Sequence, residues 1–273
     1  MKPKWLVEHF DDRNSTQLLI AEVQKQGYEL ATIKYEPFES GSYKMFGDTD
    51  CVIVQSSINF AQQIMRDRKW IPGPWLTEKN YRCSVYYAKL GKYLFNDQYV
   101  LMPRDEAMRN MTRIHGWVGR GSSIFVRPDS GLKCFTGKVF EIPVIHQDWS
   151  WVEEFTEPDT LVVLSTPKDI KAEWRFVACG KDIIAGSQYE CGGELNVSPT
   201  YPEEAKALAA EIADIYQPDP MFVIDICMGM DSQYYLMEIG AFSVAGLYAC
   251  DMEPIVEMAS KVAVAEWEDI MLP

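Results

Sequence analysis

Two apolar segments near the C-terminal end, FVIDICMG and YYLMEIG, constrain the fold of this chain more than any other feature. Each carries a single strand-embedded acid, Asp225 in the first and Glu238 in the second, and a short turn at Met230-Asp231-Ser232 separates them. Strands joined by so short a turn pair side by side, which brings the two carboxylates together. Adjacent like charges in apolar surroundings need a compensating cation, and Mg²⁺ prefers oxygen ligands. A hairpin whose acids simply face solvent is the open alternative.

The remaining patterns predict an α/β (α+β) protein. Near the N-terminus a strand, a helix from Asn14 to Gln26 that ends at Gly27, and a further strand indicate an α/β unit with a parallel sheet. The Ile71-Pro-Gly-Pro74 cluster predicts the end of this unit. A helix around Arg104 to Asn110 follows an irregular aromatic-rich stretch.

The second half of the chain reads as antiparallel strands with two helices. SSIFVRPDS and TLVVLSTP are strands that end at prolines, and EWRFVACGKDIIAGSQY is a pair of strands joined by a Cys-Gly-Lys-Asp turn. Pro202 opens an amphipathic helix with acids in its first turn, and EPIVEMASKVAVAEW predicts a second helix at the end.

Composition excludes several classes of function. A net charge of −14 argues against a general nucleic-acid-binding surface. The seven scattered cysteines form no C-x-x-C pair and indicate reduced thiols. Since no long apolar run or signal peptide is apparent, we expect a cytoplasmic protein with no membrane partner. The motifs G-x-S-x-G, H-E-x-x-H and G-x-G-x-x-G are absent from the sequence. The oligomeric state stays open, a homodimer included.

Two further segments carry candidate phosphate-binding groups. From Arg127 to Lys138, small residues that permit close backbone approach are surrounded by cations, which suits a polyphosphate. An ordinary β-turn with solvated lysines is the alternative. Arg175, in the segment Glu173-Trp174-Arg175, is either half of a structural ion pair or a clamp for phosphate or acyl oxygens.

Taken in order, these basic, small-residue, hinge-strand, arginine and acidic segments resemble the ATP-grasp superfamily. The resemblance is strongest to the branch related to ribosomal-protein glutamate ligases, with its short bacterial and phage members carrying RPD, EWR and GSQY motifs, and is clearest from Ser123 to Asp251. It implies an N-terminal α/β domain (residues 1–75) and an ATP-grasp domain (76–273). The latter would comprise a central subdomain (about 115–165) and a C-terminal subdomain (about 166–273), whose antiparallel sheets enclose ATP.

The resemblance implies ATP and Mg²⁺ as cofactors and assigns roles to individual residues. Arg175 is the implied catalytic residue, and Asp225 and Glu238 are the implied metal ligands. A flap from Ser130 to Gly137 would cover the phosphates, and the backbone of a hinge from Val163 to Thr166 would read adenine. The implied nucleotide-binding residues are Lys89, Arg127, Ser130, Lys133, Thr136, Gly137, Lys138, Val163, Leu164, Ser165 and Glu173.

The implied activity is an ADP-forming carboxylate-amine ligase that acts through an acyl phosphate. Its partners would be a small-molecule or peptide carboxylate and an amine acceptor, selected by the N-terminal domain and by loops such as Tyr189 to Pro199. One departure bears on this expectation, because relatives present Glu-x-Asn as metal ligands and this chain has Gly240 in the third position. Ser243, water or one fewer Mg²⁺ would then compensate. A non-catalytic nucleotide-binding regulator or a phosphotransferase on the same fold are the alternatives.

Overall fold

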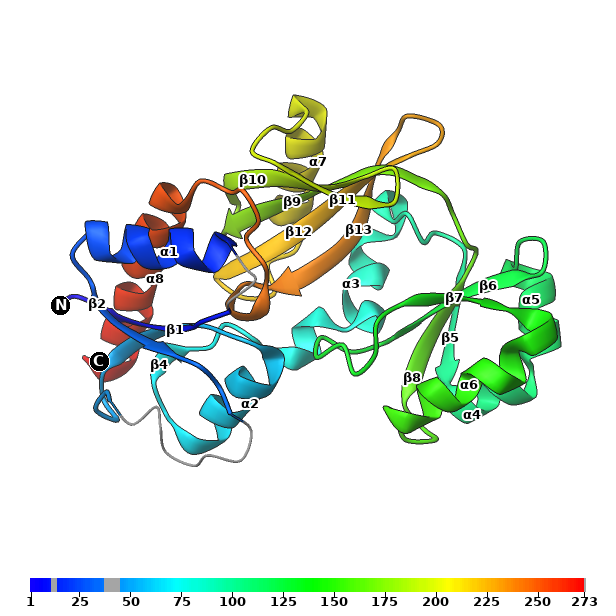
Figure 1. Ribbon diagram of the computed structural model, residues 1–273, viewed down its shortest axis with the longest axis horizontal. Helices are drawn as coiled ribbons and strands as arrows, with labels where there is room; N and C mark the ends of the chain where they lie inside the picture. The colour runs from blue at the N-terminus through cyan, green and yellow to red at the C-terminus, as the bar shows by residue number, and fades with distance from the viewer. Residues whose placement is uncertain (11–13, 37–44, 273) are drawn as a thin grey trace.

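The computed structural model describes residues 1–10, 14–36 and 45–272. Three sheets follow one another along the long axis of the molecule (Figure 1). A parallel sheet lies at the end that holds both termini, a five-stranded antiparallel sheet lies in the middle, and a four-stranded antiparallel sheet lies at the far end. The mixed α/β architecture predicted from the sequence is confirmed.

The N-terminal part is the predicted parallel α/β unit. Its strand order is β2-β1-β3-β4. Helix α1 ends as expected: Gly27 has a φ of 74°, and the N–H groups of Gly27 and Tyr28 bond to the carbonyls of Gln24 and Val23. The elements are β1 (Lys4–Glu8), α1 (Asn14–Lys25), β2 (Glu29–Ile33), β3 (Cys51–Gln55), α2 (Ile58–Asp67) and β4 (Ile71–Gly73).

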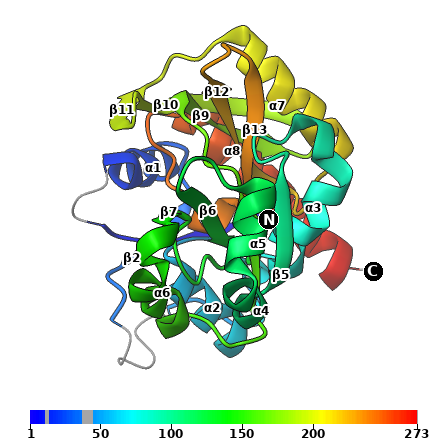
Figure 2. The ribbon, with the colours of Figure 1, turned by 90° about the vertical axis from the view of Figure 1, so that its right-hand side faces the viewer.

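The central part is a four-stranded sheet of order β5-β8-β6-β7, with α4, α5 and α6 packed on one face (Figure 2). It includes β5, which starts at Tyr99 and therefore before the boundary near residue 115 expected for this subdomain. Three short elements precede it: η1 (Glu78–Tyr81), α3 (Cys83–Leu90) and η2 (Gly91–Tyr93). Its own elements are β5 (Tyr99–Pro103), α4 (Arg104–Arg109), α5 (Met111–Val118), β6 (Ser123–Pro128), β7 (Lys138–Glu141), η3 (Ile142–Val144), α6 (Ile145–Glu154) and β8 (Leu161–Ser165).

The C-terminal part is built on the five-stranded sheet, whose order is β11-β10-β9-β12-β13. The hairpins predicted at EWRFVACGKDIIAGSQY and at Asp225 and Glu238 are both present. No helix among the described residues is long and apolar enough to cross a bilayer. The elements are β9 (Ile170–Cys179), β10 (Asp182–Cys191), β11 (Glu194–Ser198), α7 (Glu203–Ile215), β12 (Met221–Gly229), β13 (Tyr234–Ala241), η4 (Phe242–Val244) and α8 (Met252–Met271).

The two faces of the five-stranded sheet are covered differently. On one face Phe176 and Ile224 belong to an apolar cluster with α3 and α7. On the other face Val177 and Val223 pack against α8. Because side chains alternate along a strand, Arg175 lies on the same face as Val177, beyond the area that α8 covers. The fold therefore leaves a polar area on a face that is otherwise apolar.

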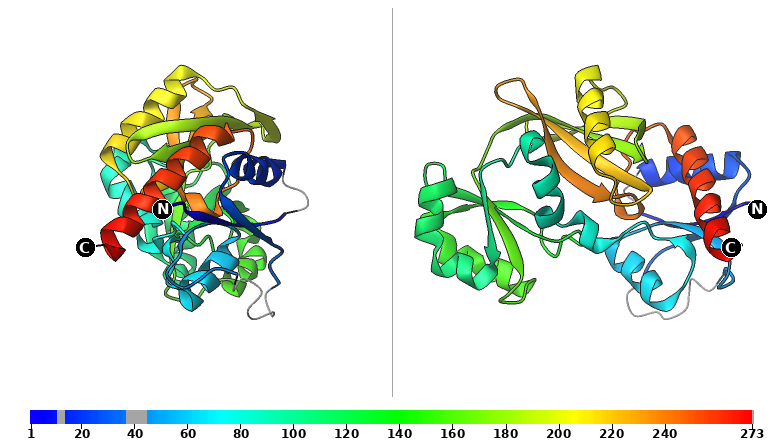
Figure 3. Two further views of the ribbon diagram at one scale, coloured as in Figure 1. Left: turned by 90° about the vertical axis from the view of Figure 1, so that its left-hand side faces the viewer. Right: turned by 180° about the vertical axis from the view of Figure 1, so that it is seen from behind.

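Helix α8 joins the N-terminal and C-terminal parts through one core. Trp5 and Ile53 of the parallel sheet share an apolar cluster with Ile255 of α8 and with Val223 of the five-stranded sheet. Figure 3 shows α8 beside α1, at the end of the molecule away from the central part.

Two chain segments, residues 94–98 and 166–169, connect the central part to the rest, and they are bonded to each other. The Lys168 ammonium donates to the Phe95 carbonyl over 2.5 Å and pairs with Asp97. The Thr166 N–H donates to the Gln98 carbonyl over 3.3 Å. The two connections therefore lie side by side.

Candidate active site

Three charged side chains form a row across the five-stranded sheet. Arg175 on β9 is the register partner of Asp225 on β12, and Asp225 is the partner of Glu238 on β13. Residues directly opposite each other in neighbouring antiparallel strands project from the same face. The structure therefore brings together the residues that the sequence assigned to catalysis and metal binding.

Asp225 accepts two hydrogen bonds from the Arg175 guanidinium, from Nε at 2.8 Å and from Nη2 at 2.6 Å. Both side chains are buried, with 9% of Arg175 and 4% of Asp225 exposed. The remaining Arg175 nitrogen, Nη1, donates to the Gly246 carbonyl over 3.0 Å. Burial alone lowers the pKa of Arg175, but Asp225 raises it above its ordinary value, so the guanidinium stays charged.

Two tyrosines that the sequence analysis did not single out flank this arginine. The rings of Tyr189 and Tyr248 stack with centroids 4.9 Å apart, and the Arg175 guanidinium carbon lies 5.6 and 5.3 Å from them. The Tyr189 hydroxyl donates to Glu173, two residues before Arg175 on the same face of β9. Burial raises the pKa of Glu173 to about 7, although the Tyr189 hydroxyl opposes this shift. The aromatic pair shields the arginine from water.

Two cations of the central part reach Glu238 from across the molecule. Arg127, at the end of β6, places Nη2 3.3 Å from Glu238 Oε1, and Lys133, in the loop before β7, places Nζ 3.1 Å from the same oxygen. Burial works to raise the pKa of Glu238, but Lys133 and Arg127 lower it to about 2. One cation from β6 and one from the loop after it therefore meet at this carboxylate of the five-stranded sheet.

The loop from Ser130 to Gly137 is anchored at both ends. Before it, Asp129 accepts hydrogen bonds from the N–H and hydroxyl of Ser84 at the start of α3, at 2.8 and 2.6 Å. At its other end a Cβ on Gly137 would lie 2.6 Å from the Phe125 ring, so only glycine allows this approach to β6. Within the loop, the Ser130 hydroxyl accepts from the Leu132 N–H over 3.1 Å. The nucleotide-binding role of Thr136 stays a prediction.

Lys89 and Lys138 do not join this group. The Lys89 ammonium lies 4.4 Å from the centre of the Tyr216 ring, directly after α7, and α7 packs on the opposite face of the five-stranded sheet. Lys138 is the register partner of Val126, whose side chain faces the helices of the central part, and its ammonium lies 5.7 Å from the ring of Trp151 on α6. Helix periodicity and strand alternation direct both lysines away from Glu238.

The backbone of the predicted hinge strand is already engaged. Strand β8, which contains Val163, Leu164 and Ser165, pairs with β5 on one side and with β6 on the other. A central antiparallel strand uses its N–H and C=O groups in both ladders. That these three residues, with Thr166, form the hinge that reads adenine stays a prediction, and the two ladders limit which of their backbone groups are available for it.

Asp225 and Glu238 fit a magnesium site of limited size. They are adjacent, and Mg²⁺ is often held by one or two carboxylates together with phosphate oxygens and water. Within the described ranges no three His, Cys, Asp or Glu side chains form a group that could hold a metal ion. The protein therefore supplies two carboxylates, each of which is paired with a cation of the chain itself.

The structure gives a reason for Gly240, and none for Ser243 as a substitute ligand. Gly240 is the register partner of Val223, and a Cβ there would lie 3.0 Å from the Val223 side chain. A larger residue would need Val223 to move within the core under α8. The Ser243 hydroxyl is buried and accepts from the Trp75 N–H over 2.9 Å. The expectation that Ser243 compensates for the missing asparagine is therefore not supported.

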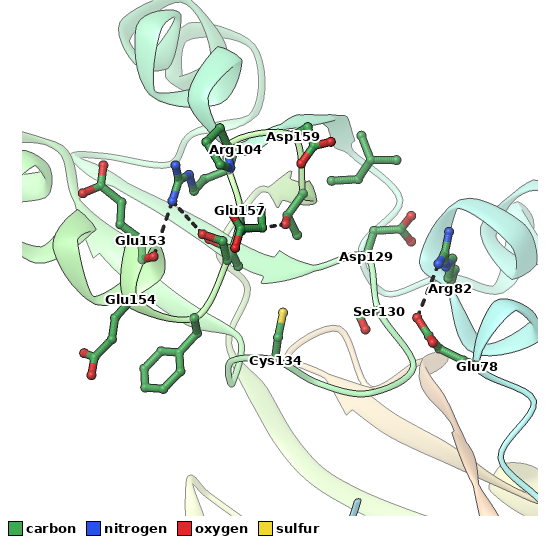
Figure 4. A pocket seen from close by; sticks show the side chains of 15 residues that line it. Glu78, Arg82, Arg104, Asp129, Ser130, Cys134, Glu153, Glu154, Glu157 and Asp159 are labelled. Atoms are coloured by element: carbon green, nitrogen blue, oxygen red, sulfur yellow. Dashed lines mark hydrogen bonds and ion pairs between the residues drawn. The ribbon is translucent and has the colours of Figure 1, made fainter. Parts of the chain in front are cut away.

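A cavity of about 870 Å³ lies apart from the row, between α3 and the loop after α6. Figure 4 shows Glu78 and Arg82 on one side of it and Arg104 with Glu153 on the other, with Ser130 of the anchored loop at its edge. Arg175, Asp225 and Glu238 do not line it. The charged row is therefore the better candidate for chemistry.

Residues 105–258 match the family described as ATP-grasp domain, R2K clade family 2. The chain belongs to this ATP-grasp family. No curated protein matches the sequence significantly. The family match confirms the membership of the ATP-grasp superfamily that the sequence predicted.

Solved structures share the fold over nearly the whole chain. The D-alanine–D-alanine ligase of Bacillus anthracis is similar with a TM-score of 0.59 and 12% identity, covering 98% of this chain and 99% of its own. The ATP-grasp ligase PsnB, complexed with a minimal precursor, has a TM-score of 0.56 and 12% identity, with coverage of 97% and 99%. A RimK domain ATP-grasp protein of Sphaerobacter thermophilus has a TM-score of 0.56 and 13% identity, and the match covers 98% of this chain and 99% of that one. At these identities the likeness establishes the fold.

Proposed function

We propose that this ATP-grasp protein is an ADP-forming carboxylate-amine ligase. The observation that carries the proposal is the meeting of Arg127 and Lys133 from one sheet with Arg175, Asp225 and Glu238 from another. Similar proteins support it, since PsnB has been solved with a precursor variant, Mg and ADP. The partners would be a small-molecule or peptide carboxylate and an amine.

In this proposal Arg127 and Lys133 bind the phosphate groups of ATP. Both cations are directed at Glu238, so phosphate oxygens would compete with this carboxylate for them. Asp225 and Glu238 would hold Mg²⁺, which neutralises charge on the transferred phosphoryl group when it is bound. While Lys133 and Arg127 lie beside it, Glu238 has a pKa of about 2, so it carries at neutral pH the negative charge that a metal ligand needs.

Arg175 would orient the carboxylate substrate. A guanidinium has five N–H groups, and three of those of Arg175 are used by Asp225 and Gly246, which leaves two for substrate oxygens. The substrate carboxylate attacks the γ-phosphorus of ATP and ADP leaves. The amine then attacks the acyl carbon, phosphate leaves, and the nitrogen loses a proton. The two free N–H groups can bind the oxygen on which negative charge develops.

Release of phosphate in the presence of acceptors tests the proposal. Purified protein is incubated with ATP, Mg²⁺ and a mixture of amino acids and polyamines, and ADP, phosphate and new amides are measured. We expect Glu238→Gln to reduce turnover by about 100-fold or more. Glu141→Gln is the matched control, because Glu141 is an exposed acid of β7 that bonds to two serine hydroxyls.

Two results would count against the ligase. Nucleotide binding without phosphate release from any acceptor would favour the non-catalytic regulator. Equal turnover in Glu238→Gln and Glu141→Gln would remove Glu238 from the active site.

A further inference from the structure

An uncharged pocket of about 520 Å³ opens beside Arg175. The start of α1, the edge strand β11 and the segment after η4 enclose it. Its walls include Leu18 of α1, Leu195 and Val197 of β11, and Val244, and all the described residues that line it are uncharged. In a chain of net charge −14, such a lining is a distinct environment.

The pocket shares residues with the surroundings of the catalytic arginine. Gly246, whose carbonyl accepts from Arg175 Nη1, lines it, and so does Tyr248, whose ring lies 5.3 Å from the guanidinium carbon. Tyr248 therefore lies between the pocket and Arg175 and is in contact with both. Arg175 itself does not line the pocket, but Gly246 and Tyr248 both contact Arg175 and line the pocket, so the two sites are adjacent.

The pocket and the phosphate-binding cations lie at opposite edges of the five-stranded sheet. Leu195 on β11 is the register partner of Glu190 on β10, and Glu190 is the partner of Glu173, so Leu195 projects from the face that carries Arg175. From this edge the order is β11, β10, β9, β12 and β13, and Glu238 on β13 meets the central part. Arg175 stands between an apolar end and a charged end.

The walls of the pocket remain exposed although they are apolar. Leu195 is 77% exposed, Val197 is 47% exposed and Leu18 is 44% exposed. Apolar side chains that converge on a concave site gain free energy when a ligand covers them. A volume of a few hundred Å³ with apolar walls and polar groups at one end is typical of small-molecule sites.

We infer that the carboxylate substrate is a short apolar peptide. The pocket would bind its apolar side chains while Arg175 holds its carboxyl group. The inference rests on the proposed function, since it makes Arg175 the group that orients the carboxylate. The volume takes more than one amino-acid side chain, and among the lining residues that the structure describes none gives a charged side chain a partner of opposite charge.

Calorimetric titration with two dipeptides tests this specificity without any turnover. N-acetyl-leucyl-leucine and N-acetyl-seryl-serine present the same carboxylate and differ only in their side chains. We expect the leucine peptide to bind about tenfold more tightly or better, since it buries more apolar area. Leu195→Glu and Val197→Glu should each abolish this preference.

Ile215→Glu is the matched control. Ile215 ends α7 on the opposite face of the sheet and is 44% exposed, close to the 47% of Val197. This variant should keep the preference for leucine. Because all three side chains are substantially exposed, the variants should fold, which circular dichroism checks.

The outcomes separate this inference from the proposed function. Equal affinity for the two dipeptides, binding of neither, or a preference that survives both β11 variants overturns the apolar specificity. Amide formation with polar carboxylates alone would overturn it while the ligase stands. A leucine preference without phosphate release from any acceptor would support the pocket and contradict the ligase.

Discussion

Replacing either partner of the Arg175–Asp225 pair should strongly destabilise the protein. The two side chains are buried, and Asp225 takes both of its bonds from one guanidinium, at 2.8 and 2.6 Å. Asp225→Asn leaves the guanidinium without a counter-charge in a place that water reaches poorly. Arg175→Met likewise leaves the Asp225 carboxylate buried without a counter-charge.

The expected size follows from this burial. Removing one partner of a buried ion pair costs about 3–5 kcal/mol of unfolding free energy, because the other charge stays buried and uncompensated. The double variant, Arg175→Met with Asp225→Asn, leaves no such charge. It should therefore cost no more than one single variant, which gives a coupling energy of about 3 kcal/mol.

Urea denaturation of the wild type, both single variants and the double variant measures this coupling. The control cycle uses Arg109 and Glu106, which pair at 2.6 Å with side chains 65% and 49% exposed. Exposed pairs contribute little, so the control coupling should stay below about 1 kcal/mol. Additive effects of Arg175 and Asp225, or a coupling no larger than that of the control, would refute the reasoning from burial.

Three further predictions concern the groups around this pair. Although burial raises the pKa of Glu238, Lys133 and Arg127 lower it from 4.5 to about 2. The contribution of ionised Glu238 to stability is therefore full above pH 4.5 and is lost as the pH falls towards 2. Glu238→Gln should remove this dependence, of which about 2 kcal/mol falls between about pH 6 and about pH 3, where urea unfolding measures it. Asp129→Ala should lower the free energy of unfolding by about 1–3 kcal/mol, because two donors of Ser84 lose their acceptor; thermal melting would detect it, and an unchanged Tm would contradict it. Gly137→Ala should cost about 1–3 kcal/mol, whereas Gly116→Ala, with open space around its Cβ in α5, should be neutral or stabilising in the same melts.

Local patterns were sufficient to predict the elements whose signals lie within a few residues. The glycine after α1, the proline before α7 and the short turn between β12 and β13 each define an element end. The turn also placed Asp225 opposite Glu238, because pairing across a hairpin follows from sequence spacing. The strand patterns thereby located the central row of the site.

Two features that the sequence analysis did not predict, helix α3 and the direction of Lys138, nevertheless have a local signal in the sequence. Helix α3 buries Cys83, Tyr86, Tyr87 and Leu90, a spacing of three and four residues typical of a helix, in a stretch that seemed irregular. Alternation along β7 likewise puts Lys138 on the side of the buried Phe140 and away from the face that carries Arg127. Helix face and strand parity decide where a lysine points, and its presence in a basic segment does not.

Other features had no local signal. Tyr248 and Gly246 meet Arg175 only because the chain returns to β9 after η4. Likewise Lys133 reaches Glu238 from another sheet. Such contacts depend on how separate parts of the chain pack, which neither periodicity nor turn chemistry specifies.

The core that α8 shares with the parallel sheet and the five-stranded sheet also determines which part of the molecule can move. Separating the two sheets would expose Trp5, Ile53 and Val223 to water, so they behave as one rigid body. The chain connects the central part to this body through the paired segments that Lys168 ties together, while Asp129 bonds to Ser84 of α3 and Val163 packs in the apolar cluster of α3 and α7. Rotation of the central part about the paired segments would therefore separate Asp129 from Ser84 and withdraw Arg127 and Lys133 from Glu238 in one movement, so opening the site and breaking its cation contacts would be the same event.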